Sequence, residues 1–189
     1  IKRYDGGTVF YKQERYSRNG KVFKMIKFRS MVPNAESDGV ARLASEGDCR
    51  ITPIGAFIRK TRIDELPQLF NILWGDMSIV GPRPERPEIA AQYRQVLPEF
   101  DLRLQVKAGL TGYAQVHGKY NTDPFDKLQM DLLYIANQSI VEDLKLILYT
   151  LKILFLPEST EGVAVGATTA MDYENAADST EKQDETVAK

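Results

Sequence analysis

The sequence predicts an α+β domain that is mostly helical and carries one small β-hairpin. Three observations support this fold class. Residues 8–28 alternate apolar and polar side chains around an Asn19-Gly20 pair, which favours a tight hairpin turn. Several later segments instead place their apolar residues at helical spacing. With 43% hydrophobic and 27% charged residues, the 189-residue chain has enough apolar side chains for a packed core.

The hairpin is expected to carry Val9 and Tyr11 on its first arm and residues 22–28 on its second. The following stretch, residues 33–50, is polar and contains one proline and two glycines. We therefore expect a loop there, with at most one helical turn.

Helices are expected from residue 53 onward. Residues 53–63 place apolar side chains on one helical face. A short helix, Gln68–Leu73, is expected to begin after Pro67 and to end at Gly75. The remaining expected elements are helices at 87–97, 124–138 and 142–155, and a short strand at Tyr113–Val116.

The helix at 143–155 is apolar on nearly all sides. At this length it suits either a buried core helix or an amphipathic helix lying in a membrane interface. A buried helix is the commoner case in folded domains. The chain contains no run of about 18 apolar residues that could span a bilayer.

The chain divides near Pro157 into a basic body and an acidic tail. Residues 157–189 contain two basic and eight acidic residues, which leaves 23 of the 25 basic and 18 of the 26 acidic residues for 1–156. The body therefore has charge +5 and the tail −6. The tail has few large apolar groups and is expected to be disordered. A basic body favours anionic partners such as phosphates, nucleotides, a membrane surface or nucleic acid.

The chain has one cysteine, Cys49, and one histidine, His117. It can form neither an intramolecular disulfide nor a Cys/His zinc site, so any bound metal is expected to be a hard ion held by carboxylates and phosphates. We assign Cys49 no role. A solitary histidine such as His117 is more often structural than catalytic. The first residues, Ile1 to Gly7, lack the apolar core of a signal peptide, and we expect the sequence to be a piece of a longer chain.

Asp64 and Glu65 are adjacent carboxylates that follow the cations Arg59, Lys60 and Arg62. An ionised aspartate can attack phosphorus as a nucleophile, and its neighbour can hold a divalent ion. The break before Pro67 would place the pair at a bend in a helix. The alternative is an ordinary helix N-terminus, where acidic residues are favoured by the dipole.

A second candidate segment runs from Gly81 to Pro87 and contains three prolines, which stiffen its backbone. Such a segment could aim Arg83, between Pro82 and Pro84, at a phosphate. The alternative is a proline-rich connector with a solvated arginine. Lys27 and Arg29 close the hairpin with a basic cluster, which could equally be a solvated strand edge.

Together, several motifs resemble one family, the bacterial sugar transferases, which are monotopic polyprenyl-phosphate phosphoglycosyl transferases. The resemblance covers about Phe10 to Leu156. The motifs, in order, are VFKMIKFRSM at 22–31, RITPIG at 50–55, RKT at 59–61, DELPQLFN at 64–71, GDMSIVGPRPE at 75–85 and KAGLTG at 107–112. Many members have asparagine where this chain has His117. The family's membrane re-entrant helix, which precedes the segment matching residues 1–10, is absent from this sequence.

The resemblance implies roles for particular residues. Asp64 matches the nucleophile, and Glu65 matches its partner in a dyad associated with Mg²⁺, so both are candidate metal ligands. Arg83, flanked by Pro82 and Pro84, matches the phosphate-binding arginine. Lys27 and Arg29 match basic positions near the active site. Residues 1–156 would form the catalytic domain.

The implied reaction moves a sugar phosphate from a UDP-sugar to undecaprenyl or another polyprenyl phosphate through an aspartyl-phosphosugar intermediate, and initiates surface polysaccharide, capsule or glycoconjugate synthesis. The implied location is the cytoplasmic face of the bacterial inner membrane, reached through amphipathic helices and the missing anchor. No nucleic-acid partner is expected, because no such motif is present; a homo-oligomer stays open. The alternative is a non-catalytic peripheral membrane or regulatory module that retains the fold.

Overall fold

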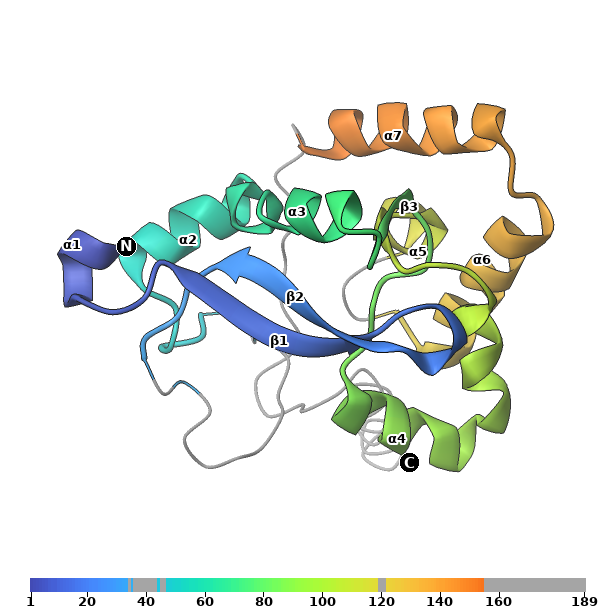
Figure 1. The fold of residues 1–189 in the computed structure, drawn as a ribbon, viewed down its shortest axis with the longest axis horizontal. Coiled ribbons are helices and arrows are strands. Elements are labelled where there is room, and N and C mark those ends of the chain that lie inside the picture. Colours follow the sequence, from blue (N-terminus) through green and yellow to red (C-terminus); the bar gives the residue numbers. More distant parts are fainter. Residues whose placement is uncertain (34, 36–43, 45–46, 119–121, 155–189) are drawn as a thin grey trace, which may run out of the picture.

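The computed structural model describes residues 1–33, 35, 44, 47–118 and 122–154 (Figure 1). It confirms an α+β fold rich in helix. The elements, in chain order, are α1 (Lys2–Asp5), β1 (Phe10–Tyr16), η1 (Arg18–Gly20), β2 (Val22–Phe28), α2 (Pro53–Lys60), η2 (Ile63–Glu65), α3 (Gln68–Leu73), β3 (Ser78–Val80), α4 (Pro87–Val96), η3 (Pro98–Gln105), β4 (Gly109–Thr111), α5 (Tyr113–His117), α6 (Pro124–Ala136) and α7 (Ile140–Leu154). Most of the expected loop at 33–50 and all of the expected tail at 157–189 lie outside the described residues.

The β1–β2 hairpin confirms the prediction from alternation. The strands pair antiparallel from Phe10 opposite Phe28 to Tyr16 opposite Val22. The turn needs positive φ at two successive residues, and Asn19 and Gly20 supply it with φ of 57° and 73°.

A second, parallel pair joins β3 to β4. The predicted strand at Tyr113–Val116 is wrong: the strand lies just before it, and residues 113–117 form the short helix α5. Tyr113 and Val116 are three positions apart, so one helical turn directs both onto the same core cluster. The strand itself needs glycine, since a Cβ at Gly109 would lie 2.1 Å from the backbone nitrogen of Gly81.

Three clusters of buried side chains form the core. The first joins α4, η3 and α6, the second joins β2 to the segments flanking β3 and β4, and the third joins β3, α6 and α7. Their buried members are Ile89, Ala90, Tyr93, Phe100 and Leu128; Phe23, Met25, Met77 and Ala108; and Val80, Tyr134 and Leu146.

Helix α2 begins with a capped turn and is held close to the hairpin. The Thr52 hydroxyl accepts a hydrogen bond from the Gly55 amide at 2.9 Å, and Pro53 occupies the first turn. A Cβ on Gly55 would lie 1.8 Å from the carbonyl oxygen of Ser30, so glycine is required for this approach. The helix ends at Lys60, earlier than predicted, because Arg62 adopts a left-handed conformation with φ of 57°.

Helix α7 is attached to the body by polar side chains and by two apolar residues, the buried Leu146 and the partly buried Ile147. Tyr113 donates a hydrogen bond to Glu142, Tyr134 donates one to Asp143 at 2.9 Å, and Leu146 is buried. The alternative of a core helix is therefore wrong for most of its length. Its exposed large apolar residues are Ile140, Val141, Leu144, Leu148, Tyr149 and Leu151.

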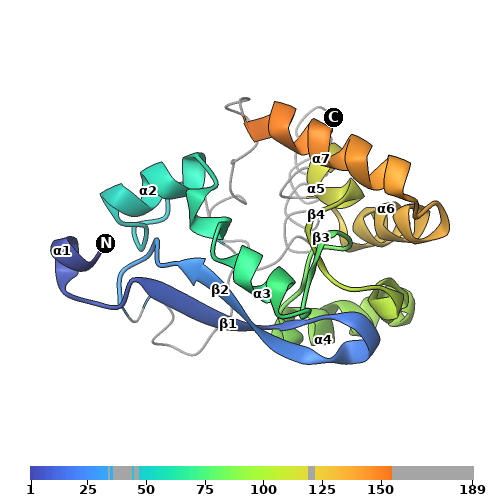
Figure 2. The same cartoon turned by 45° about the horizontal axis from the view of Figure 1, so that its top comes forward.

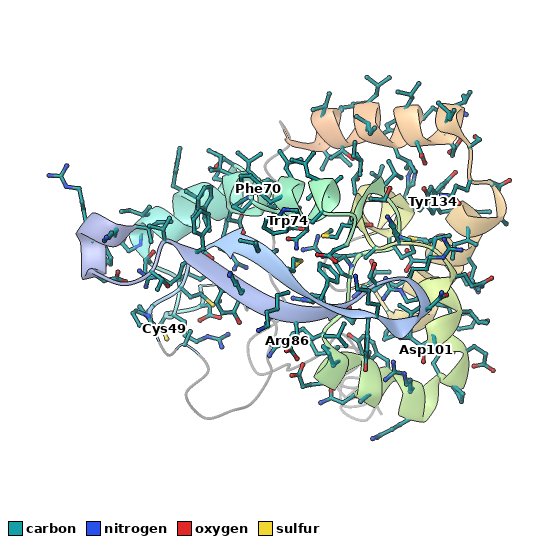
Figure 3. The ribbon with its side chains drawn as sticks, in the orientation of Figure 1. Cys49, Phe70, Trp74, Arg86, Asp101 and Tyr134 are labelled. Carbon is teal, nitrogen blue, oxygen red and sulfur yellow. The ribbon has the colours of Figure 1, made fainter. Side chains whose placement is uncertain are left out.

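Helices α2 and α3 also leave apolar side chains exposed: Ile54, Phe57, Leu69, Phe70 and Leu73, together with the neighbouring Leu66 and Trp74. In Figure 1 α2, α3 and α7 lie on the side of the molecule opposite α4, and in Figure 2 α3 runs from α2 toward the centre. The labelled Phe70 and Trp74 lie on this side (Figure 3), with ring centroids 6.0 Å apart. Among the described helices, none is long and apolar enough to cross a membrane.

Candidate active site

The Asp64-Glu65 pair lies at a break in the chain between two helices, as predicted. Helix α2 ends at Lys60, η2 spans Ile63–Glu65, and α3 begins at Gln68. The left-handed conformation of Arg62 turns the chain at this break, and a non-glycine residue held there costs about 1–3 kcal/mol that surrounding contacts must offset.

Asn71 fastens α3 to the hairpin strand that carries Lys27. Its side-chain Oδ1 accepts a hydrogen bond from the Ile26 amide at 3.0 Å, and its Nδ2 donates one to the Lys24 carbonyl at 3.0 Å. Asn71 is 1% exposed, so both bonds are shielded from water. The Asn71 side chain therefore fixes the position of β2 relative to the segment that bears the two carboxylates.

Glu65 is surrounded by three cations from three parts of the chain. Lys27 Nζ lies 2.8 Å and Arg83 Nη2 lies 3.1 Å from Glu65 Oε1, and Arg62 approaches Oε2 at 4.0 Å. Burial acts to raise the pKa of Glu65, but the three cations outweigh it and hold that pKa well below its usual range. Glu65 is therefore ionised at neutral pH. Burial also lowers the pKa of Lys27, against the opposing effect of Glu65.

Asp64 occupies a different environment from its neighbour. It is 6% exposed, and burial raises the pKa of its carboxyl, helped by Glu65 and opposed by Lys27, Arg59 and Arg83. Within the described ranges, no side chain or backbone amide donates a hydrogen bond to this carboxylate. Its oxygens are thus not committed to a protein donor.

Four cations act on this pair of acidic groups: Lys27, Arg59, Arg62 and Arg83. Arg83 keeps 39% of its side chain exposed, so a ligand can reach it from solvent. Cations placed beside an open carboxylate suit an anionic ligand such as a diphosphate.

The segment around Arg83 is held by hydrogen bonds to its carbonyl groups. Gly109 donates its amide to Pro82 at 2.9 Å, Arg103 donates to Arg83 at 2.8 Å, and Arg15 donates to Pro84 at 3.1 Å. Pro82 and Pro84 are themselves buried. The predicted rigid support for Arg83 is therefore present.

Arg29 is not brought into the Glu65 cluster. Its guanidinium binds both carboxylate oxygens of Asp5 and donates from Nε to the Thr8 carbonyl at 2.7 Å. These contacts give Arg29 a structural role at the start of the domain, and its predicted role near the active site stays a prediction. His117 is exposed and contacts the rings of Tyr113 and Tyr149, which fits the structural interpretation. Cys49 is exposed.

Some residues that shape this region were not assigned to the site from the sequence. Arg59 and Arg62 were recognised only as cations preceding the acidic pair. The ion pair between Arg103 and Asp131 carries no local sequence signal, because its members are 28 positions apart. Lys127 on α6 was not assigned either. Burial lowers its pKa, Glu85 acts to raise that pKa, and Arg83 acts to lower it.

Asp64 and Glu65 are the predicted magnesium ligands, and they offer two carboxylates. Magnesium is usually bound by one or two carboxylates together with waters and phosphate oxygens. Both Glu65 oxygens already lie near cations, Oε1 near Lys27 and Arg83 and Oε2 near Arg62. The carboxylate that is more open to an ion is therefore that of Asp64.

A family model described as bacterial sugar transferase matches residues 1–157. The chain belongs to this family. A UDP-glucose:undecaprenyl-phosphate glucose-1-phosphate transferase of Klebsiella pneumoniae is 44% identical over 155 residues, covering 79% of this chain and 33% of the relative. A UDP-N-acetylgalactosamine-undecaprenyl-phosphate N-acetylgalactosaminephosphotransferase of Aeromonas hydrophila is 41% identical over 155 residues, covering 80% and 36%.

An undecaprenyl-phosphate galactose phosphotransferase of Salmonella typhimurium is 39% identical over 164 residues, covering 79% of this chain and 34% of the relative. The chain thus spans about a third of the length of these curated relatives. Their names specify three different sugars at similar identity, so overall similarity does not select the sugar.

Proposed function

We propose that this bacterial sugar transferase domain transfers a sugar phosphate from a UDP-sugar to a polyprenyl phosphate, as the initiating step of a surface polysaccharide or glycoconjugate. The observation that carries the proposal is that two adjacent carboxylates lie in different electrostatic environments. Arg83 and Lys27 form ion pairs with Glu65, whereas no donor among the described residues bonds the Asp64 carboxylate. The named relatives support it, since their names specify undecaprenyl phosphate and a sugar phosphate.

In the proposed reaction Asp64 is the nucleophile. Its carboxylate oxygen forms a bond to the phosphorus attached to the sugar, and the bond from that phosphorus to the bridging oxygen breaks, so uridine monophosphate leaves with the electron pair. An oxygen of the polyprenyl phosphate then attacks the same phosphorus and releases the Asp64 carboxylate. Two bulky substrates, one soluble and one in lipid, can thereby use one site in turn.

The cations around the pair stabilise charge during both steps. Arg83 can grip a phosphate with two N–H groups, and Lys27 and Arg62 hold Glu65 ionised beside it. Glu65 and Asp64, together with donor phosphates, would hold a magnesium ion, which would further neutralise the diphosphate. The cations at this site would thereby compensate the negative charge of the donor diphosphate and of the leaving uridine monophosphate.

The exposed apolar residues of α2, α3 and α7 are proposed to contact the cytoplasmic face of the bacterial membrane. Phe57, Leu73, Trp74 and Leu148 are each more than 60% exposed, and in Figure 1 the three helices lie on the side opposite α4. An apolar face of this kind is favoured in a lipid interface. The acceptor lipid would then approach from the same side.

The test of transfer is mass spectrometry of the intact protein after incubation with Mg²⁺ and a panel of nucleotide sugars, without acceptor. We expect a mass gain equal to one phosphosugar, which names the sugar. Asp64→Asn should abolish the gain, and Asp126→Asn, at an exposed position on α6, should keep it. A folded parent protein that gains no mass with any donor, and turns over none when acceptor is added, supports the non-catalytic module instead.

The test of membrane contact is co-sedimentation with vesicles that contain anionic phospholipid. Leu144→Glu with Leu148→Glu should reduce binding, because both side chains are exposed on α7. Val96→Glu is the matched control, since Val96 is 62% exposed on α4, on the opposite side (Figure 1). Equal binding by both variants would contradict the proposed face.

A further inference from the structure

Arg103 lies beneath the Arg83 segment and makes two polar contacts with one nitrogen. Its Nη2 donates to the Arg83 carbonyl at 2.8 Å and lies 2.6 Å from Asp131 Oδ2. The side chains of Arg103 and Asp131 are 3% and 1% exposed, and the guanidinium stacks over the Phe100 ring at 4.8 Å. The pair thus links η3, α6 and the backbone of Arg83 in the interior.

Stability alone does not account for this pair. A buried ion pair often stabilises a fold no better than apolar side chains of similar volume, because both charges lose their hydration. The pair is also incompletely satisfied, since Arg103 Nε, Arg103 Nη1 and Asp131 Oδ2 are buried without a hydrogen-bond partner in the part of the chain that the structure describes, and Asp131 holds Arg103 by charge at 2.6 Å. The contact that apolar residues could not reproduce is the hydrogen bond to the Arg83 carbonyl.

The Arg83 and Pro84 carbonyls depend on side chains for their support, those of Arg103 and Arg15, whereas the Pro82 carbonyl does not. The Pro82 carbonyl accepts from the backbone amide of Gly109, which side-chain substitutions leave in place. Arg83, Phe100 and Arg103 line one small pocket at this place. The hydrogen bond from Arg103 is the polar contact that holds the Arg83 carbonyl beside it.

We propose that Arg103, held in place by Asp131, is a positioning residue that aims the Arg83 guanidinium at the donor diphosphate. The inference rests on the proposed function of the site and names a residue pair outside it. Lysine at position 103 keeps a cation beside Asp131. Its single ammonium lacks the planar fork that fixes the direction of the contact with the Arg83 carbonyl.

The experiment is a double-mutant cycle on binding of uridine diphosphate with Mg²⁺, measured by calorimetry. The four proteins are the parent, Arg83→Ala, Arg103→Lys and the double variant. Arg103→Lys should weaken binding about tenfold in the parent, as expected for losing a well-aligned bond of a charged group. In the Arg83→Ala background it should cause no further loss, because the guanidinium that it positions is gone. Thermal unfolding of each protein reports any change in stability.

Asp131→Glu provides a second route if Arg103→Lys folds poorly, since it keeps the charge and displaces the carboxylate by one methylene. It should show the same dependence on Arg83. Parent-like binding by either folded variant, or an equal loss in both backgrounds, overturns the positioning role. Additive losses together with a phosphosugar adduct on Asp64 reject the positioning role alone. Coupled losses without any adduct reject the transferase proposal and leave the Arg103 assignment standing.

Discussion

The ion pairs at Glu65 and at Asp131 differ in their charge balance and in their access to solvent. At Glu65 three cations share one carboxylate, and Arg83 is 39% exposed. At Asp131 a single arginine faces a single carboxylate, and both are almost completely buried. The first arrangement lies where a ligand can reach Arg83, while the second joins internal segments. Substitutions in the first should therefore change chemistry with little effect on stability. Substitutions in the second should change stability as well as the binding of the donor through Arg83.

The largest effect is expected for Asp64→Asn. Turnover should fall by about a thousandfold or more, because the amide is no nucleophile. Stability should be equal or higher, since burial raises the pKa of Asp64 and the neutral amide avoids the cost of a buried charge. Transfer assays and thermal unfolding on the same preparation check both. Near-parent turnover by folded protein would contradict the nucleophile assignment.

Asp131→Asn should mainly destabilise the fold. Removing one partner leaves Arg103 buried without a counter-charge, which typically costs about 3–5 kcal/mol. The control is Asp101→Asn, which breaks an exposed pair with Arg94 and should cost about 1 kcal/mol or less. Denaturant unfolding measures the two free energies. Equal values for both variants would remove the contrast between a buried and a surface pair.

Arg83→Lys should raise the KM for the nucleotide sugar about tenfold and leave thermal stability close to the parent value. Lysine keeps the positive charge near Glu65 but cannot offer two parallel N–H groups to a phosphate. Arg94→Lys, at a half-buried position on α4, is the matched control and should leave KM unchanged, because Arg94 pairs with Asp101 and not with Glu65. An Arg83→Lys enzyme with parent kinetics would mean that charge alone suffices.

The smallest effect concerns the Asp5–Arg29 pair at the start of the domain. The Arg29 hydrogen bond lowers the pKa of Asp5 from 3.8 to about 2. A lowered pKa in the folded state stabilises the fold above the unfolded value of 3.8, and this contribution is lost as pH falls through about 2. Asp5→Asn should therefore melt below the parent at neutral pH, and the gap should close on acidification. A gap that widens instead would contradict the ion pair.

Local sequence patterns predicted the hairpin and the short helix α3, because neighbouring residues determine both elements. The hairpin follows from alternation and the Asn19-Gly20 turn, and α3 follows from Pro67 and Gly75. The strand expected at Tyr113–Val116 failed because an i, i+3 pair of apolar residues fits one helical turn as well as a short strand. The parallel β3–β4 pair was not predicted, since three-residue strands leave too short a pattern.

The site shows the same division between local and distant information. Asp64, Glu65 and Arg83 stood out by their motifs, and Lys27 was assigned by resemblance. That Lys27 and Arg83 both contact Glu65 could be seen only in the structure. The left-handed turn at Arg62, which places Glu65 there, has no signature in residue type. Helix α7 was ambiguous because an apolar helix has the same pattern whether protein or lipid covers it.

The side chain of Asn71 also affects how the hairpin behaves toward other chains. By bonding the Ile26 amide and the Lys24 carbonyl, it occupies part of the β2 edge that a third strand would otherwise use. Open strand edges invite pairing between molecules. Asn71→Ala should leave the Ile26 amide and the Lys24 carbonyl without a partner beneath α3, a cost that favours separation of α3 from β2. Separation would open this strand edge to another copy of the chain, so loss of one side-chain amide would promote self-association.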